Sequence, residues 1–85
     1  MKVLIPSSLR SYTNAMWAQA SGTSLGELLL DLDRQHPGIR FRMVDEQEQL
    51  RPHMRVFVNG RAVKSLAHGL APADEVAIVQ ALSGG

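Results

Sequence analysis

The sequence predicts an α+β domain in which a mixed sheet of about four to five strands carries one main helix on one face. Short aliphatic runs at residues 2–5 and 74–81 are typical of buried strands. One segment between them has helical periodicity, and Asn59-Gly60 joins two shorter runs as in a β-hairpin. Because the chain has only 85 residues, 45% of them hydrophobic, it can form one core. The few aromatic residues are expected to be the large side chains of this core: Tyr12, Trp17, Phe41 and Phe57.

Two strands are expected before the helix. Residues 2–5 form an aliphatic run that Pro6 ends, because proline has no N–H to donate. Residues 7–14 are polar and are expected to form a turn. In residues 15–20 the side chains alternate between two faces, which predicts a second strand.

The helix is expected to begin after Ser24. Ser24 and Glu27 have the spacing of a capping box, in which the serine hydroxyl accepts from the backbone of the third helical residue. Leucines then recur at helical spacing and form one apolar side: Leu25, Leu28, Leu29 and Leu32. The helix should end near His36, since Pro37-Gly38 cannot continue it.

A hairpin is expected in the second half of the chain. Residues 39–52 have no regular period and are expected to form an irregular segment with room for a helical turn. Residues 53–58 then alternate, with Val56 on the face opposite Phe57. Asn59-Gly60 supplies a two-residue turn into a short strand at residues 61–63.

The last strand is expected at residues 74–81, after a loop rich in Gly and Ala at residues 65–72. Val76 and Ile78 share one of its faces. Because both terminal strands are strongly apolar, we expect them side by side in the centre of the sheet. One helix covers only one face of so short a sheet, and this order of elements is the β-grasp arrangement.

The composition excludes several classes of function. Without cysteine the chain has no disulfide, thiolate zinc site or thiol nucleophile. His36, His53 and His68 lie on separate segments without metal-ligand spacing, so neither a metal nor an enzyme site is expected. A net charge of +1 argues against nucleic acid as the partner. No apolar run has the length of a signal peptide or of a membrane span, so we expect a cytoplasmic protein without a membrane partner.

Basic residues are concentrated in the middle of the chain. Seven of the nine lie there: Arg34, Arg40, Arg42, Arg51, Arg55, Arg61 and Lys64. Asp45, Glu46 and Glu48 interrupt this positive charge, which favours an acidic partner over nucleic acid. A solvated surface without any partner is the alternative, because exposed charges contribute little by themselves.

The C-terminal residues Ser83-Gly84-Gly85 are the main candidate for chemistry. We expect residues 1–82 to form the domain and residues 83–85 to form a flexible tail. Since glycine has no Cβ, such a tail can enter a channel too narrow for side chains. Its terminal carboxylate offers an unhindered oxygen for attack on the α-phosphate of ATP. A chain end without function is the alternative.

The tail belongs to a set of segments that runs through nearly the whole chain: residues 2–6 with Leu9-Arg10, residues 23–28, residues 56–60, Leu70, residues 74–78 and residues 83–85. Together with the expected β-grasp order, this set resembles the MoaD/ThiS family of ubiquitin-like sulfur carriers. Its most specific element is the last strand followed by Gly-Gly at the terminus.

The resemblance implies a carrier rather than an enzyme. In this family an ATP-dependent, E1-like activating enzyme adenylates the terminal glycine carboxylate, here Gly85, and a sulfur donor displaces AMP to leave a thiocarboxylate. ATP and magnesium are used by that enzyme, so this chain itself is expected to bind no cofactor. A sulfur-accepting synthase is the second implied partner.

The resemblance also suggests roles for four other residues. Gly84 gives clearance in the channel and Ser83 continues the extended tail. The apolar sheet face, with Phe57 and Leu82, docks the partner. Packing in the core or at a sheet edge is the alternative role for these two side chains.

Several pathways remain open at this point. The opening at residues 5–13 and the long middle at residues 37–52 are more similar to carriers for cysteine, methionine or siderophore sulfur assembly than to thiamin carriers. Some of these carriers are made with extra residues after Gly-Gly, which a metalloprotease removes. The alternatives are the small subunit of molybdopterin synthase, a ubiquitin-like protein modifier joined to lysines, and a non-catalytic β-grasp interaction domain.

Overall fold

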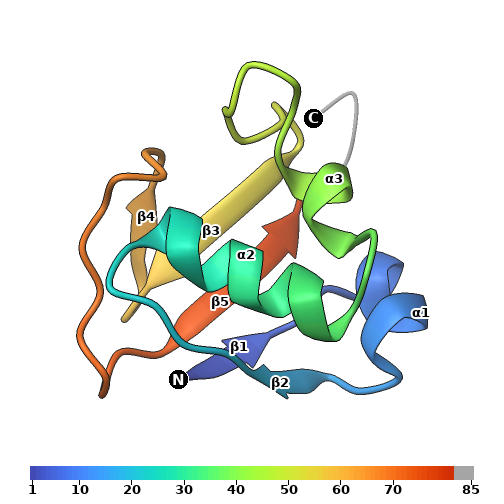
Figure 1. The fold of residues 1–85 in the computed structure, drawn as a ribbon, viewed down its shortest axis with the longest axis horizontal. Coiled ribbons are helices and arrows are strands. Elements are labelled where there is room, and N and C mark those ends of the chain that lie inside the picture. Colours follow the sequence, from blue (N-terminus) through green and yellow to red (C-terminus); the bar gives the residue numbers. More distant parts are fainter. Residues whose placement is uncertain (82–85) are drawn as a thin grey trace.

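The computed structural model describes residues 1–81, and these form a five-stranded mixed sheet crossed by a helix (Figure 1). The strand order is β2-β1-β5-β3-β4. The strands are β1 (Lys2–Leu4), β2 (Trp17–Gln19), β3 (Met54–Val58), β4 (Arg61–Val63) and β5 (Val76–Gln80). The predicted β-grasp class is therefore confirmed.

The two terminal strands lie side by side, as their apolar sequences predict. β1 and β5 are parallel, with Val3 opposite Val76 and Leu4 opposite Ala77. The other neighbouring pairs, β1 with β2, β3 with β5 and β3 with β4, are antiparallel. β5 is the middle strand of the sheet, so it is hydrogen-bonded to β1 on one side and to β3 on the other. It is also the last strand before the C-terminus.

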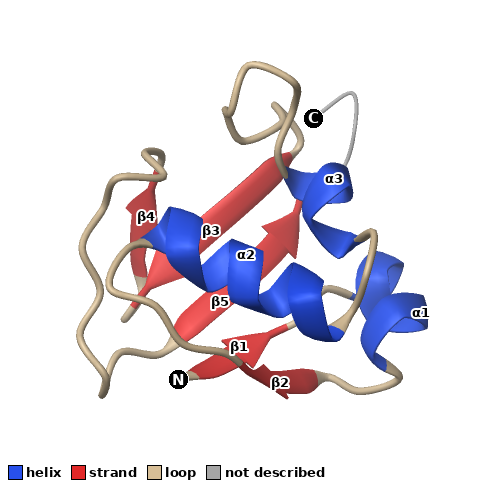
Figure 2. Cartoon of the chain, viewed as in Figure 1, coloured by secondary structure: helices blue, strands red, loops and turns tan. Residues whose placement is uncertain are grey.

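Helix α2 (Leu25–Gln35) lies across one face of the sheet (Figure 2). Its four leucines at helical spacing are fully buried, as predicted: Leu25, Leu28, Leu29 and Leu32. They pack against the inward side chains of the strands, among them Val56 and Ile78. Because full burial of one such side chain is worth about 1.5–3 kcal/mol, this contact holds the helix on the sheet.

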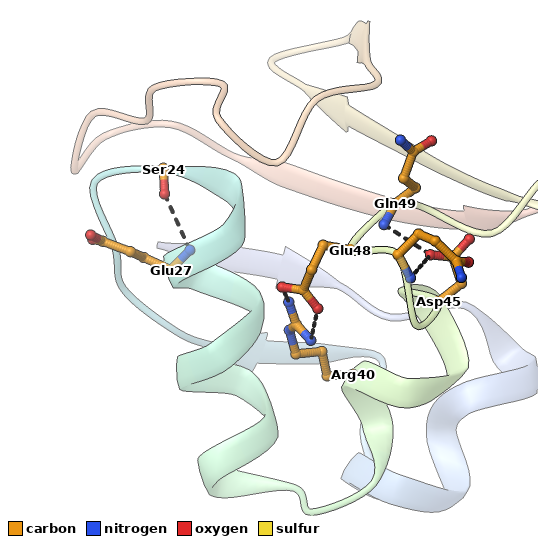
Figure 3. A network of polar contacts seen from close by, with 7 residues as sticks. Ser24, Glu27, Arg40, Asp45, Glu48 and Gln49 are labelled. Atoms are coloured by element: carbon orange, nitrogen blue, oxygen red, sulfur yellow. Dashed lines mark hydrogen bonds and ion pairs between the residues drawn. The ribbon is translucent and has the colours of Figure 1, made fainter.

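The N-terminus of α2 is capped as the sequence predicts, with one difference. The Ser24 hydroxyl accepts from the Glu27 N–H at 3.2 Å (Figure 3). The Glu27 carboxylate does not return to Ser24 but accepts from the N–H and the hydroxyl of Thr23, at 2.9 and 2.8 Å. These two hydrogen bonds hold the pKa of Glu27 below its usual value. The cap therefore includes Thr23, the residue before Ser24, whereas a capping box involves only the N-cap residue and the third helical residue.

Replacement of Ser24 by alanine tests the cap. We expect Ser24→Ala to lower the free energy of unfolding by about 1 kcal/mol, because the Glu27 N–H loses its acceptor. Urea denaturation followed by circular dichroism measures this difference. Ser21→Ala is the control, since that hydroxyl makes no hydrogen bond to any of residues 1–81. Equal stability of the two variants would show that the cap contributes nothing.

The segment before β2 is helical, so the predicted turn at residues 7–14 is wrong. A 3₁₀ turn (Ser7–Leu9) leads into the short helix α1 (Arg10–Thr13). Leu9 is only 2% exposed, and the Arg10 Nε donates to the Ile5 carbonyl at 2.9 Å. Burial of one leucine thus favours helical turns in a segment whose local composition favours a loop.

The expected irregular segment, residues 39–52, is more ordered than its sequence indicates. Helix α3 (Ile39–Met43) is followed by a tight turn that brings Val44 opposite Leu50. The Asp45 carboxylate accepts from the backbone N–H groups of Gln47 and Gln49, at 2.9 and 3.0 Å (Figure 3). These bonds add to the backbone hydrogen bonds of the turn, in which the Glu48 N–H donates to the Asp45 carbonyl at 3.1 Å and the Asp45 N–H donates to the Gln49 carbonyl at 2.8 Å.

The β3–β4 hairpin has the predicted turn. Asn59 and Gly60 have φ values of 51° and 85°, the left-handed pair that a type I′ turn needs. The Asn59 side chain also donates to Asp74 at 2.9 Å and accepts from the Glu75 N–H at 3.0 Å. The hairpin is thereby tied to the chain just before β5.

Asp74 makes the free energy of unfolding depend on pH in the acidic range. A hydrogen bond from the Ala71 N–H and a second from Asn59 lower the pKa of Asp74. As pH falls, the Asp74 carboxylate is therefore protonated at a higher pH in the unfolded chain than in the folded chain. The stabilisation by Asp74 is complete above about pH 4 and is lost as pH falls through the lower pKa of the folded state. We expect Asp74→Asn to flatten the fall in unfolding free energy below about pH 4. Denaturant titrations at several pH values measure the slope. An unchanged slope in Asp74→Asn would contradict the assignment.

The aromatic residues do not fill the core, which corrects the expectation for this chain. Phe41 is 63% exposed and Trp17 is 38% exposed. Tyr12 is half-buried at the margin of the core, and Phe57 is half-buried on the sheet face away from α2. The core consists of aliphatic and methionine side chains instead, because a short sheet and one helix pack closely enough for these to fill the space.

Candidate functional site

The sheet face opposite α2 carries a row of apolar side chains, one from each strand. Strand register places these residues next to one another in the order Trp17, Leu4, Ala77, Phe57 and Ala62. We call these five residues the apolar row. It crosses the full width of the sheet and passes through the central strand.

The side chains of the apolar row are at least partly exposed because successive residues of each strand point to opposite faces of the sheet. The residues that precede or follow it, such as Val3, Val56 and Val76, are buried under the helices. Leu4, Phe57 and the other members of the row point the opposite way and are half-buried or exposed. No helix among the described residues lies over this side of the sheet, so the row is available to a partner.

Charged residues border the apolar row on this face. The Lys2 ammonium lies 4.4 Å from the centre of the Trp17 ring, close enough for a cation–π contact. Arg55 is exposed opposite Val79, which is itself 39% exposed. An apolar centre with a cationic rim is the composition of a protein-docking surface rather than of a buried core.

The end of β5 lies beside this face and is firmly held. The Ala81 N–H donates to the His53 carbonyl at 2.7 Å, and the Ser8 hydroxyl contacts the Gln80 side-chain oxygen. A depression of about 630 Å³ flanks the strand end, with Arg10 among its lining residues. The part of the chain that the structure describes thus ends at a fixed point, from which residues 82–85 continue.

Of the five residues predicted for the site, the structure describes one. Phe57 lies in the apolar row between Ala77 and Ala62, so it belongs to the exposed sheet face and not to the core. The remaining four lie outside the described residues, and their roles stay predictions: Leu82, Ser83, Gly84 and Gly85.

Four members of the row are not among the predicted site residues, and Trp17 and Leu4 have the largest side chains of these four. The sequence predicts a core position for Trp17 and a buried strand for residues 2–5, and neither prediction places a side chain on this face. Alternation in each strand, combined with the pairing of β1 with β2 and β5, is the signal that places both on the same face as Phe57.

Other chemistry is not found in residues 1–81. No three His, Asp or Glu side chains in this part of the chain gather as metal ligands would. None of its helices has the length and apolar character needed to cross a membrane.

Comparison with protein families decides the assignment. The model of the ThiS family matches residues 3–85, which is nearly the entire chain. The chain belongs to the ThiS family. The match extends through the C-terminal residues and so includes the tail that the sequence singles out.

Curated relatives of this ThiS family member include the sulfur carrier protein CysO of Mycobacterium tuberculosis and of Mycobacterium bovis. Each is 34% identical over 89 residues, an alignment that covers 98% of this chain and 96% of the relative. The likeness therefore extends over the whole length of both proteins.

Solved structures confirm the ubiquitin-like fold. A chain in the crystal structure of the Amycolatopsis orientalis BexX/CysO complex has a TM-score of 0.91 and 32% identity, over 99% of this chain and 98% of that one. Mycobacterium tuberculosis CysO has a TM-score of 0.90 and 32% identity, over 95% and 98%. SAMP1 from Haloferax volcanii has a TM-score of 0.79 and 26% identity, over 100% and 98%.

Proposed function

We propose that this protein is a sulfur carrier, activated by a partner enzyme at the carboxylate of Gly85. The observation that carries the proposal is its likeness to the sulfur carrier protein CysO over 98% of the chain. Membership of the ThiS family and the Gly-Gly ending support it further. In this role the protein is a co-substrate and leaves the bond-making catalysis to its partners.

The chemistry proceeds in two steps that balance. One oxygen of the Gly85 carboxylate attacks the α-phosphorus of ATP and expels pyrophosphate, which leaves an acyl adenylate. A sulfide equivalent then attacks the carbonyl carbon and releases AMP, which leaves a thiocarboxylate. The adenylate is needed because a carboxylate oxygen is a poor leaving group and AMP is a good one. The activating enzyme binds the ATP and magnesium.

The fold provides a docking surface for the partner and a fixed end of β5 from which the tail begins. We assign the apolar row to the contact with the activating enzyme, because it is the apolar surface that the helices leave open. β5 runs from Ala77 in this row to Ala81, where the hydrogen bond to His53 fixes its end. A partner that grips the row is thereby placed near the start of the tail, while Gly84 and Gly85 enter its active site.

The sulfur acceptor is a metabolite of cysteine, methionine or a related pathway. We place cysteine biosynthesis first, because the curated relatives are CysO sulfur carriers. The partner that takes the sulfur is then a synthase with a channel narrow enough for a glycine tail.

The likeness to SAMP1, the small archaeal modifier protein 1, favours one second candidate. A protein modifier uses the same adenylate but transfers Gly85 to a lysine amine in place of sulfide. Immunoblots of cells that produce a tagged chain distinguish the two roles, because a modifier gives conjugates of higher mass and a carrier does not.

Pyrophosphate exchange tests the activation step directly. The full chain is incubated with the E1-like enzyme of its own organism, ATP, magnesium and labelled pyrophosphate. We expect label to enter ATP only when the chain is present, because adenylate formation is reversible. Exchange that does not depend on the chain would overturn the proposal and favour an interaction domain.

A further inference from the structure

A groove beside the first half of β3 adjoins the docking face, with which it shares Arg55 and Ala62, and it takes no part in the proposed adenylation and sulfur transfer. Its walls are the loop around Arg51 and the end of β4 with the residues that follow, up to Leu66, and it holds about 630 Å³. In Figure 1 the loop before β3 lies at the upper end of that strand, and the end of β4 lies to the left of the strand. Ala62, the last member of the apolar row, is among the residues that line the groove.

The floor of the groove is aliphatic. Met54, Val56 and Val63 point into the core and are at most 8% exposed. Leu50 and Leu66 are half-buried at its sides and present apolar surface to the groove. None of the lining residues is aromatic. The groove therefore suits an aliphatic side chain and offers no ring on which a nucleic-acid base can stack.

The rim of the groove is positively charged. Arg51, Arg55 and Lys64 line it, and Glu48 is the only carboxylate among its lining residues. Glu48 is already paired with Arg40, with two Nη to Oε distances of 2.8 and 3.3 Å (Figure 3). The three cations thus have no acidic counterpart within the groove, although the chain as a whole has a net charge of only +1.

Two of the three cations are held in position by the chain itself. The Arg51 Nε donates to the Phe41 carbonyl at 2.8 Å, and its guanidinium lies 4.8 Å from the centre of the Phe41 ring. The Arg55 Nη1 donates to the carbonyls of Pro52 and Met54. Each guanidinium keeps further N–H donors, and its fixed position lowers the entropy lost when a carboxylate binds.

We propose that this groove binds an acidic, extended segment of a partner protein. Carboxylates of the segment pair with Arg51, Arg55 and Lys64, and an aliphatic side chain between them packs against Leu50 and Leu66. Charge complementarity and the aliphatic floor favour a peptide over nucleic acid. Because the groove joins the apolar row at Ala62, a partner docked on the sheet face can reach it with one segment.

The test is a titration of the ¹⁵N-labelled full chain with a capped peptide in which valines are flanked by glutamates. We expect shifts of backbone amides around Leu50–Val56 and Ala62–Leu66, and binding that weakens as salt is added. Lys64→Glu should weaken binding at least about tenfold, since a repulsion replaces an attraction. The Lys64 side chain makes no hydrogen bond to the described residues, so the Lys64→Glu variant should keep the wild-type fold. Arg55→Glu is the second variant.

The control is Arg42→Glu, which reverses an exposed charge outside the groove and should leave the affinity unchanged. A second control peptide carries lysines in place of the glutamates and should not bind. The proposal fails if the shifts are confined to the apolar row, if Lys64→Glu and Arg42→Glu have the same affinity, or if a single-stranded DNA octamer binds the same amides as tightly. These outcomes are independent of whether Gly85 is adenylated.

Discussion

A chain that lacks Gly84 and Gly85 is expected to lose adenylation completely and to keep its fold. The reacting carboxylate moves back to Ser83, which carries a Cβ and ends two residues short of the enzyme's α-phosphate site. The buried core that the structure describes is built from residues 3–78, none of which the deletion removes, so the circular dichroism spectrum and unfolding midpoint should match those of the full chain. Pyrophosphate exchange with the activating enzyme measures the loss.

A chain extended by one alanine beyond Gly85 is the matched control for this deletion. It keeps both glycines but displaces the carboxylate, so it should be inactive as well. Continued exchange by the truncated chain would mean that activation does not occur at Gly85.

Phe57→Asp is expected to reduce kcat/KM of the activation reaction at least about thirtyfold, mainly through a higher KM. Phe57 is the largest side chain in the middle of the apolar row, and loss of such an anchor typically costs about 2 kcal/mol or more. Its neighbours Val56 and Val58 make the core contacts of β3, so the variant should remain folded. Steady-state exchange at varied carrier concentration gives both constants.

Phe41→Asp is the control for this substitution, because it makes the same chemical change at a side chain that is 63% exposed on α3. Its kcat/KM should stay within about twofold of the wild-type value. A Phe57→Asp variant that is folded and fully active would remove the apolar row from the docking interface.

The elements with strong local signals were predicted well from the sequence. The leucine spacing and Ser24 mark α2, and Asn59-Gly60 marks the β3–β4 hairpin, because these patterns reflect interactions within a few residues of each other. The central position of β1 and β5 followed from their apolar sequences.

The features that the sequence did not predict depend on contacts between distant residues. Residues 7–13 are helical because Leu9 reaches the core, and Phe41 is exposed because aliphatic side chains already fill the space under α2. The position of Trp17 beside Leu4, and of Leu4 beside Ala77, follows from strand pairing across most of the chain. Composition gives no indication of such register.

The candidate site also has features that the sequence predicts and features that depend on contacts between distant strands. Phe57 was predicted as a docking residue through the family resemblance, and strand register places it in a continuous apolar row. The roles of Gly84 and Gly85 come from the chemistry of a glycine carboxylate and from the family, and they are open to direct measurement.

Intact mass spectrometry tests the central claim most directly. The full chain is incubated with its activating enzyme, ATP, magnesium and a sulfide source, and its mass is compared with that of the chain lacking Gly84 and Gly85. We predict exchange of one oxygen for one sulfur, localised to Gly85 by fragmentation and absent from the truncated chain. An unchanged mass, with an enzyme shown to be active on another carrier, would contradict the sulfur-carrier account.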